Sequence, residues 1–392
     1  MKPENDRLFH MKTVLYVNGT EKFQDRQRLA GVTEYAQQHG WNLQSVEPLQ
    51  SPKQAKELIR IWNPDGFIVC KGATLNQLPA KCFGNAPVLF SHNPILDKGA
   101  KENCIFNDSS ATVEMAVKEL LSLNLNGYAF VGWNKPTGWS IQRKLVFNSL
   151  MTMHGKQAHV FEPSERKCSP NTLSSKLAEW LSKLPRPLGV LGANDQIAHQ
   201  IIRACHLIHL EVPDDVAVVG IDNDEELCES AHPSISSIDV GFAASGLAAA
   251  AELDKLMSSP NVAPIHIKFA PLCLVRRKST RRFKRIDKDV SKAVEHIRRE
   301  ACNGISSRDI TDDFDCSRRM AEIRFRNIIG HSILQEIRQV RLETAKRLLR
   351  NPGLGMNFIA NNCGYSSPSA FSIFFHAETG QSPSSWRDSI GT

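Results

Sequence analysis

ANNCGYSSPSAFSIFFHAETGQSPSSWR, residues 360–387, determines the fold class of the C-terminal part of the chain. A turn glycine (Gly364) and two phenylalanines one helical turn apart (Phe371 and Phe375) predict a short helix, a tight turn and a second helix that packs back on the first. A unit of this geometry can place its second helix in the major groove of DNA. The sequence therefore predicts a helix-turn-helix over about 356–377.

A second copy of this pattern precedes it, over about 306–328. SSRDITDDF predicts a helix opened by serine caps, and SRRMAEIRFRNI predicts a second helix after a turn, with Met320 and Phe325 in the core and arginines on the remaining surface. An arginine-rich helix after a tight turn is typical of a nucleic-acid reader. The residues that we expect to contact DNA are Arg318, Arg319, Glu322 and Arg326 in the first copy, and Ser367, Ser369 and Ser372 in the second.

Apolar residues spaced three and four apart between the copies, from Ile333 to Leu349, predict a rigid connecting helix. Such a helix would hold the two helix-turn-helix units, called the first reader (about 306–328) and the second reader (about 356–377), at a fixed distance. A fixed distance suits an operator with adjacent repeats about 34 Å apart. Charge is distributed unevenly between the C-terminal part of the chain and the rest. Residues 276–392 contain 22 lysines and arginines against 13 acidic residues, a net charge of +9, whereas residues 1–275 contain 26 against 28, a net charge of −2. The positive excess therefore favours a C-terminal surface that binds phosphates.

The part of the chain before residue 276 alternates buried strands with helices. This order predicts doubly wound α/β sheets, and about 265 residues favour two lobes with a cleft between them over a single sheet. The predicted strands lie in KTVLYVNG, DGFIVC, PVLFSH, GYAFVGW, LGVLGAN and VAVVGID, and the predicted helices lie around 25–39, 52–62, 110–124, 139–154, 171–184, 195–209 and 241–258.

Polar residues at the carboxyl ends of these strands are candidates for a ligand site, because open parallel sheets bind ligands there. Asp195 and Asp222 each end a strand, and Trp139 and Arg143 open the helix after GYAFVGW. Carboxylates and a guanidinium are directional partners for hydroxyl groups, and an indole can stack on a sugar ring. Taken singly, each residue fits a helix cap or a surface ion pair. Together they favour a small polyol ligand.

Residues 288 to 388 resemble the DNA-binding domain of AraC-type transcription regulators. The matching positions are Ser317, Arg318, Phe325, Gly330, Arg341, Leu342, Ala345, Leu348, Leu349, Ala360, Gly364, Tyr365, Phe371, Phe375, Gly380, Ser382, Pro383 and Arg387. The chain departs from that family at Ile323, Ile373 and His376, where basic or polar residues are usual. These departures indicate that the second reader uses phosphates, DNA shape or thymine methyl groups more than hydrogen bonds to base edges.

The α/β part resembles the sugar-binding core of LacI-type regulators, through ND at 194–195, VPDDVAVVGID at 212–222 and HPSISSID at 232–239. The resemblance implies that Arg143, Asp195 and Asp222 hold a sugar, with Trp139 and Asp25 near the cleft. A LacI-type core joined to an AraC-type tail, together with DRQ at 25–27, resembles the regulators of xylose operons. That layout implies D-xylose as the effector, a homodimer, and activation of transcription through contact with RNA polymerase.

The sequence thus predicts a sugar-binding domain over 1–275, a basic linker over 276–289 and a DNA-binding domain over 290–392. The linker fits either a solvated hinge or a contact with the DNA backbone. Ten cysteines without a CxxC pair, no apolar signal segment and no run of about 18 apolar residues indicate a cytoplasmic protein with reduced thiols and no membrane partner. The chain shows no motif for a nucleotide cofactor, a metal or a catalytic nucleophile.

Three alternatives remain at this point. The effector can be another sugar. The C-terminal helices can bind a protein instead of DNA, in which case the α/β part is a cytoplasmic solute-binding module. Asp195 and Asp222 can also be imagined as the carboxylate pair of a sugar-processing enzyme with a fused regulator domain.

Overall fold

The computed structural model describes residues 11–19, 22–71, 78–91, 102–133, 137–163, 170–259, 264–281, 287–349 and 355–390. The chain divides into two compact units, residues 1–281 and 282–392. The first unit has two α/β lobes, each built around its own six-stranded sheet. The second unit is helical throughout its described residues. This organisation confirms the predicted fold class.

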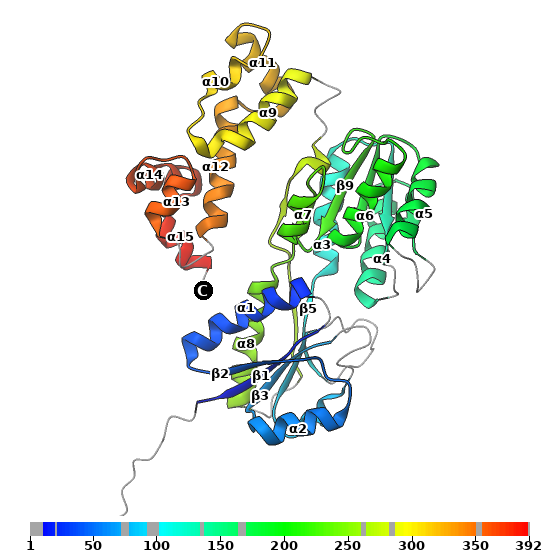
Figure 1. The fold of residues 1–392 in the computed structure, drawn as a ribbon, viewed down its shortest axis with the longest axis vertical. Coiled ribbons are helices and arrows are strands. Elements are labelled where there is room, and N and C mark those ends of the chain that lie inside the picture. Colours follow the sequence, from blue (N-terminus) through cyan, green and yellow to red (C-terminus); the bar gives the residue numbers. More distant parts are fainter. Residues whose placement is uncertain are drawn as a thin grey trace, which may run out of the picture. The chain divides into compact units, whose positions relative to one another are not determined.

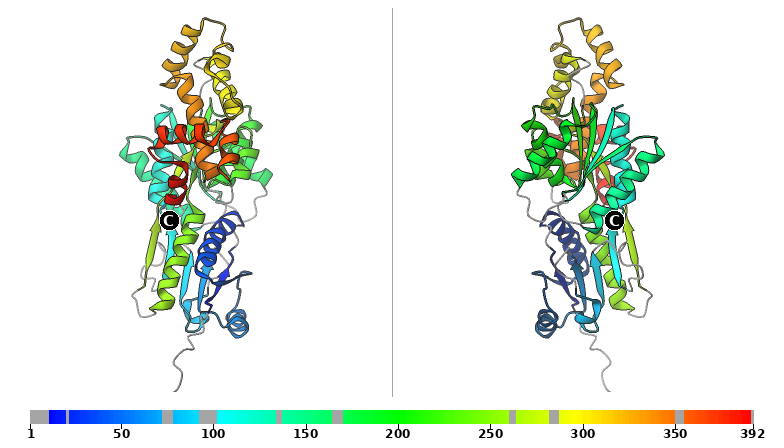
Figure 2. Two further views of the ribbon diagram at one scale, coloured as in Figure 1. Left: turned by 90° about the vertical axis from the view of Figure 1, so that its left-hand side faces the viewer. Right: turned by 90° about the vertical axis from the view of Figure 1, so that its right-hand side faces the viewer.

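The first lobe contains a parallel sheet in the order β11-β5-β4-β3-β1-β2. Its helices α1 and α8 cover one face, and α2 with the 3₁₀ helix η1 covers the other (Figures 1 and 2). The bounds are β1 Thr13–Val17, α1 Lys22–His39, β2 Asn42–Val46, α2 Pro52–Trp62, β3 Gly66–Cys70, η1 Ala80–Phe83, β4 Val88–Ser91, β5 Asn103–Asn107, α8 Phe242–Ser258 and β11 His266–Phe269.

Two glycines allow α1 and α8 to pack closely against each other. A Cβ atom at Gly31 would lie 1.9 Å from the carbonyl oxygen of Ala243, and one at Gly246 would lie 2.0 Å from that of Arg28. No side chain fits at those distances, so the helix backbones meet directly. This contact fixes the N-terminal half of α1, which carries Asp25 and Arg28.

The second lobe contains a sheet in the order β12-β10-β9-β8-β6-β7, in which only β12 is antiparallel to its neighbour. Helices α3 and α4 cover one face and α5 and α6 the other. The bounds are α3 Ser109–Ser122, β6 Gly127–Val131, α4 Gly138–Met153, β7 Ala158–Phe161, α5 Pro170–Ser182, β8 Leu188–Gly192, α6 Asp195–Leu207, β9 Val216–Ile221, α7 Glu225–Ser230, β10 Ser236–Asp239, β12 Cys273–Val275 and η3 Lys278–Thr280.

All predicted strands and helices of this unit are present, as β1, β3, β4, β6, β8 and β9, and as α1 to α6 and α8. The strands that the sequence analysis did not predict are β2, β5, β7, β10, β11 and β12. Several are short or polar, such as NLQSV in β2 and SSID in β10. Their sequences lack the continuous apolar run by which a buried parallel strand is recognised.

The second unit has two hydrophobic cores joined by one long helix, α12. Ile333 and Ile337 of α12 belong to the first core, and Ala345 and Leu349 belong to the second. In Figure 1, α12 runs from the group of α9, α10 and α11 to the group of α13, α14 and α15. The bounds are α9 Lys288–Glu300, η4 Ala301–Asn303, α10 Ser307–Thr311, α11 Arg318–Ile329, α12 Ile333–Leu349, α13 Met356–Asn362, α14 Pro368–Thr379 and α15 Pro383–Ile390. Both helix-turn-helix patterns and the connecting helix are therefore confirmed.

Two details of this unit differ from the prediction. Met320 was expected in the core, but its side chain is 49% exposed because it lies on the outer face of α11, whereas Phe325 is fully buried as expected. Leu334 belongs to the apolar spacing of α12, yet it is also exposed. Among the residues that the structure describes, no helix has both the length and the apolar character needed to cross a membrane.

Candidate functional site

Arg143 of α4 and Asp222, directly after β9, form the centre of the candidate ligand site. Arg143 Nη2 lies 3.4 Å from Asp222 Oδ1, and Arg143 Nη1 donates to the carbonyl oxygen of Ala193. Gln24, from the other lobe, donates from Nε2 to Asp222 Oδ2 over 2.9 Å. Burial raises the pKa of Asp222, and the guanidinium of Arg143 opposes this shift. The carboxylate of Asp222 therefore has partners on both lobes.

Trp139 lies beside this cluster, one turn before Arg143 on α4. Its ring centroid is 5.0 Å from Arg143 Cζ, within the range of a cation–π contact, and 6.0 Å from the ring of Trp133. The indole is partly exposed. The structure thus brings Arg143, Asp222 and Trp139 together at the carboxyl ends of the strands, where parallel sheets bind ligands.

Asp195 lies behind Asp222 and supports the loop that carries it. Ser237 Oγ donates to Asp195 Oδ1 over 2.5 Å, and the backbone N–H of Asp224 donates to Oδ2 over 2.7 Å. Burial, reinforced by the nearby carboxylate of Asp222, raises the pKa of Asp195 to about 8. Both carboxyl oxygens therefore have partners within the lobe. This geometry favours a positioning role for Asp195 over direct contact with a sugar.

The loop supported by Asp195 has an unusual backbone conformation. Asp222 has φ 110° and Asn223 has φ 52°, both in the region that favours glycine. Such residues cost about 1–3 kcal/mol each and cluster at ligand sites. The loop is held by hydrogen bonds from Asp222 N to the carbonyl oxygen of Ile238 (2.9 Å) and from Asn223 N to Ser237 Oγ (3.1 Å).

Asp25 belongs to a buried polar cluster in the first lobe. Arg28 Nη1 lies 3.5 Å from Asp25 Oδ1 and 3.7 Å from Cys70 Sγ, and Tyr16 donates its hydroxyl proton to the carbonyl oxygen of Asp25 over 3.1 Å. Desolvation lowers the pKa of Arg28, but its neighbours Cys70, Tyr16 and Asp25 outweigh this and raise it overall.

Among the candidate site residues that the structure describes, Nε of Arg28 and Nε of Arg143 are buried and have no hydrogen-bond partner; Nε and Nη2 of Arg298, in the second unit, are also buried without one. An unsatisfied buried donor is costly, so hydroxyl groups of a bound molecule would stabilise those of Arg28 and Arg143. The sequence analysis did not predict Arg28 or Gln24. The sequence does indicate both residues: Gln24, Asp25 and Arg28 lie in the first two turns of the helix that follows a predicted strand. Side chains at that place are near the carboxyl ends of the strands, where parallel sheets bind ligands.

The start of the basic segment 276–289 is anchored on the second lobe, so residues 276–281 are not a solvated linker. Arg277 is only 7% exposed. It donates to Glu229 Oε1 (2.5 Å), Asn223 Oδ1 (3.0 Å) and the carbonyl oxygen of Ile235 (3.0 Å). Arg276 pairs with Glu119, at 2.8 Å. Residues 282–286 lie outside the described residues.

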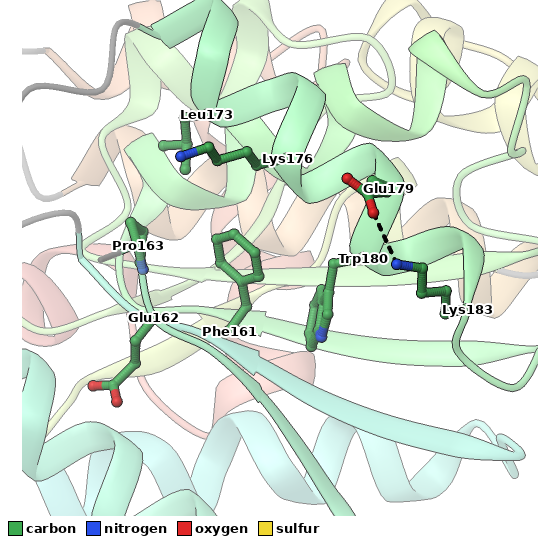
Figure 3. A pocket seen from close by; sticks show the side chains of 8 residues that line it. All are labelled: Phe161, Glu162, Pro163, Leu173, Lys176, Glu179, Trp180 and Lys183. Atoms are coloured by element: carbon green, nitrogen blue, oxygen red, sulfur yellow. Dashed lines mark hydrogen bonds and ion pairs between the residues drawn. The ribbon is translucent and has the colours of Figure 1, made fainter. Parts of the chain in front are cut away.

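A separate pocket of about 360 Å³ lies between the end of β7 and α5 (Figure 3). The rings of Phe161 and Trp180, 5.2 Å apart, form its apolar wall. On its rim Lys183 pairs with Glu179 at 2.8 Å. None of the predicted sugar-binding residues lines this pocket, so it is distinct from the Arg143 and Asp222 cluster.

In the first helix-turn-helix, Arg318, Arg319 and Arg326 of α11 are exposed and available to a large partner. Glu322 is half-buried, and its Oε2 has no partner among the residues described. Arg324 has a different role. It binds Asp287 (2.6 Å) and Asp289 (3.0 Å) at the start of α9, and so joins two helices of the same core.

In the second helix-turn-helix, Ser367 caps α14 and accepts a hydrogen bond from Ala370 N over 3.2 Å. Ser369 is exposed and Ser372 is half-buried. The opposite face of α14 carries Phe371, Phe374 and Phe375, which pack into the second core. The serines therefore lie at the start and on the outer side of the helix, as a reader requires.

Comparison with known proteins finds relatives of both the α/β unit and the helical unit. Residues 117–280 match the model of the periplasmic binding protein-like domain, and residues 310–389 match that of a helix-turn-helix domain. The xylose operon regulatory protein of Haemophilus influenzae is 32% identical over 287 residues, covering 72% of this chain and 74% of that protein. The protein of the same name from Escherichia coli strain K12 is 28% identical and covers 97% of both. A solved structure of the xylose-binding transcription activator XylR is 27% identical, with a TM-score of 0.61 over 96% of this chain and 97% of that one.

Proposed function

The chain belongs to the family of xylose operon regulatory proteins, and we propose that it activates genes of pentose catabolism when D-xylose occupies the first unit. The observation that carries this proposal is the meeting of Arg143, Asp222 and Gln24 in a chain that also contains two helix-turn-helix motifs. Asp222 has hydrogen-bond donors on both lobes, so a ligand at this point can control how the lobes close.

Arg143 and Asp222 would bind sugar hydroxyls, and Trp139 would cover the apolar face of the ring. On the first lobe, Gln24, Asp25 and Arg28 would complete the site. The hydrogen bond between Gln24 and Asp222 joins the lobes directly. A sugar that replaces it with its own hydrogen bonds favours one closed arrangement by its differential affinity for the two states, commonly about 1–3 kcal/mol.

Sugar occupancy would reach the DNA-binding unit through Asn223. This residue follows Asp222 in the strained loop, and its side-chain oxygen accepts from Arg277 over 3.0 Å. Arg277 lies near the end of the first unit, five residues before the segment that leads to the second unit. A movement of Asp222 on sugar binding would therefore shift Asn223 and its hydrogen bond with Arg277, which anchors the segment that leads to the second unit.

As a regulator of this kind, the chain would act in the cytoplasm as a homodimer, bind an operator with adjacent repeats and contact RNA polymerase. Its relatives are transcription regulators. A role without catalysis accounts for Asp195 and Asp222, since the first supports the loop and the second binds the ligand. We therefore propose no enzymatic activity.

Isothermal titration of the full chain with D-xylose, L-arabinose, D-ribose and D-glucose tests the sensor. We expect binding that is strongest for D-xylose, without turnover of the bound sugar. If another sugar of the panel binds most strongly, that sugar is the effector and the first unit is still a sugar sensor. If none of the sugars binds, the sugar assignment is refuted. Gel-shift titration with promoter DNA at several salt concentrations tests the readers. A salt-insensitive, sequence-independent result would favour helices that bind protein.

A further inference from the structure

The outer face of α14 carries no lysine, arginine or carboxylate around its exposed Ile373, although it lies in the second DNA-reading motif. Ile373 is 73% exposed, and no other large hydrophobic side chain of the second unit is as exposed among the described residues. Its exposed neighbours at helical spacing are Ser369, Ala370, His376 and Ala377. The face therefore contains no lysine, arginine, asparagine, glutamine or carboxylate.

Charge along the C-terminal part of the chain separates the two readers. Residues 276–287 carry a net charge of +6 and residues 288–349 carry +3, whereas residues 350–392 carry two basic and two acidic residues, a net charge of 0. Phosphate contacts need positive side chains. Arg276 and Arg277 are paired with Glu119 and Glu229 in the first unit. Among the described residues, phosphate contacts therefore belong mainly to the first reader, whose helix α11 exposes Arg318, Arg319 and Arg326.

An exposed isoleucine on a reading helix has one complementary feature in the major groove. Guanine, cytosine and adenine present hydrogen-bonding atoms there, whereas thymine also presents its C5-methyl group. We infer, on the basis of the proposed DNA-binding function, that α14 recognises thymine through contact between Ile373 and this methyl group. The two readers then contact DNA in different ways. Helix α11 contributes positive charge and hydrogen bonds, and α14 contributes apolar contact with a thymine-containing half-site.

The buried side of α14 supports a test by substitution. Phe371, Phe374 and Phe375 hold the helix in its core, and Ile373 lies outside that core. Replacement by alanine, a better helix former, should leave the fold intact. Removal of one buried methyl-sized group from an apolar contact costs about fourfold in affinity.

The experiment uses the full chain with D-xylose and a duplex selected by this chain from random sequence. Each thymine of the duplex is replaced in turn by deoxyuridine, which removes only the methyl group, and affinities are measured by fluorescence anisotropy. We expect one or two replacements in one half-site to weaken binding about threefold to fivefold. Ile373→Ala should lose affinity for the unmodified duplex and become insensitive to those same replacements, while Ile373→Val should remain sensitive. The salt dependence should be unchanged in both variants.

Met153→Ala changes an equally exposed apolar residue of the first unit and serves as the matched control. It should bind like the unmodified chain. Tolerance of every deoxyuridine, or equal sensitivity in the chain and in Ile373→Ala, would overturn the inference. Normal DNA binding by Ile373→Ala together with poor activation of transcription would also overturn it, because the outer face of α14 would then contact RNA polymerase instead of DNA. Failure of the unmodified chain to select any duplex would instead refute the proposed DNA-binding function.

Discussion

Asp222 combines three properties that rarely meet at one residue. It is buried, it has φ 110°, and it accepts hydrogen bonds from Arg143 and from Gln24 on the other lobe. Strain of this kind persists only where the surrounding structure enforces it. At this position Asp195 and Ser237 supply that support through the following residues. The arrangement is suited to sensing a ligand.

Asp222→Ala should abolish the transcriptional response to sugar and leave DNA binding intact. The change removes a charged acceptor, whose hydrogen bonds are each worth about 1.5–3 kcal/mol, so we expect at least a tenfold loss of xylose affinity in isothermal titration. Asp214→Asn changes an equally buried carboxylate at the opposite end of β9 and is the control. A variant at Asp222 that still responds normally would remove this residue from the site.

The stability of the first unit should depend on pH through Asp195. The pKa of this carboxyl is raised from 3.8 to about 8 by burial and by Asp222, so the folded chain keeps a proton that the unfolded chain has lost. Its contribution to stability is therefore present below about pH 4 and is lost as pH rises towards 8. In urea unfolding, the free energy of Asp195→Asn should fall less over this range than that of the unmodified chain. Parallel pH profiles would contradict this assignment.

Arg319 and Arg324 lie on the same helix but should respond differently to removal. Arg319 is exposed, so Arg319→Ala should weaken operator binding by about 1–3 kcal/mol without loss of stability, if it contacts a base by two hydrogen bonds. Arg324 binds Asp287 and Asp289, so Arg324→Ala should lower the melting temperature of the second unit. Equal loss on operator and random DNA would make Arg319 a phosphate contact instead.

Sequence reasoning identified Arg143, Asp222 and Trp139 because each follows a recognisable buried strand. Gln24 and Arg28 also follow a recognisable strand, β1, but their contacts could not be predicted, and Arg277 follows no such strand. The role of Gln24 depends on contact between two lobes, and that of Arg277 on the packing of a basic segment against the second sheet. A run of basic residues is usually solvated, so local composition gave the wrong environment for Arg277.

At the scale of elements, the prediction succeeded where one local signal was strong. Fully buried strands such as β3 and β9 are continuous apolar runs, and α2, α10 and α11 begin at serine caps visible in the sequence. It failed for β10 and β12, whose pairing depends on residues far apart in the chain. Helix α9 was also not predicted separately, although its buried face completes the first core of the second unit.

The loop between β9 and α7 should couple sugar binding to DNA binding through Asn223. Asn223→Gly keeps the backbone conformation, because glycine adopts φ 52° freely, but removes the acceptor for Arg277. We expect xylose and operator DNA each to bind separately with normal affinity, while the effect of xylose on operator affinity becomes smaller. Arg276→Gln breaks a half-exposed pair with Glu119 and should leave the coupling unchanged. Full coupling in Asn223→Gly would exclude this route.

At the scale of the whole molecule, the chain joins a two-lobed receptor to a pair of DNA readers. Coupling between two binding sites is reciprocal: if sugar changes operator affinity by a given factor, operator DNA changes sugar affinity by the same factor. A fused solute-binding module without communication would bind each partner independently. Reciprocity therefore separates a regulator from two unconnected domains.

The most direct test of the account is the xylose affinity of the full chain, measured by titration calorimetry with and without saturating operator duplex. The account predicts that operator DNA raises xylose affinity about 5-fold to 150-fold, and that a scrambled duplex does not. Identical xylose affinity in the presence and absence of the operator would contradict the claim that sugar occupancy controls the DNA readers.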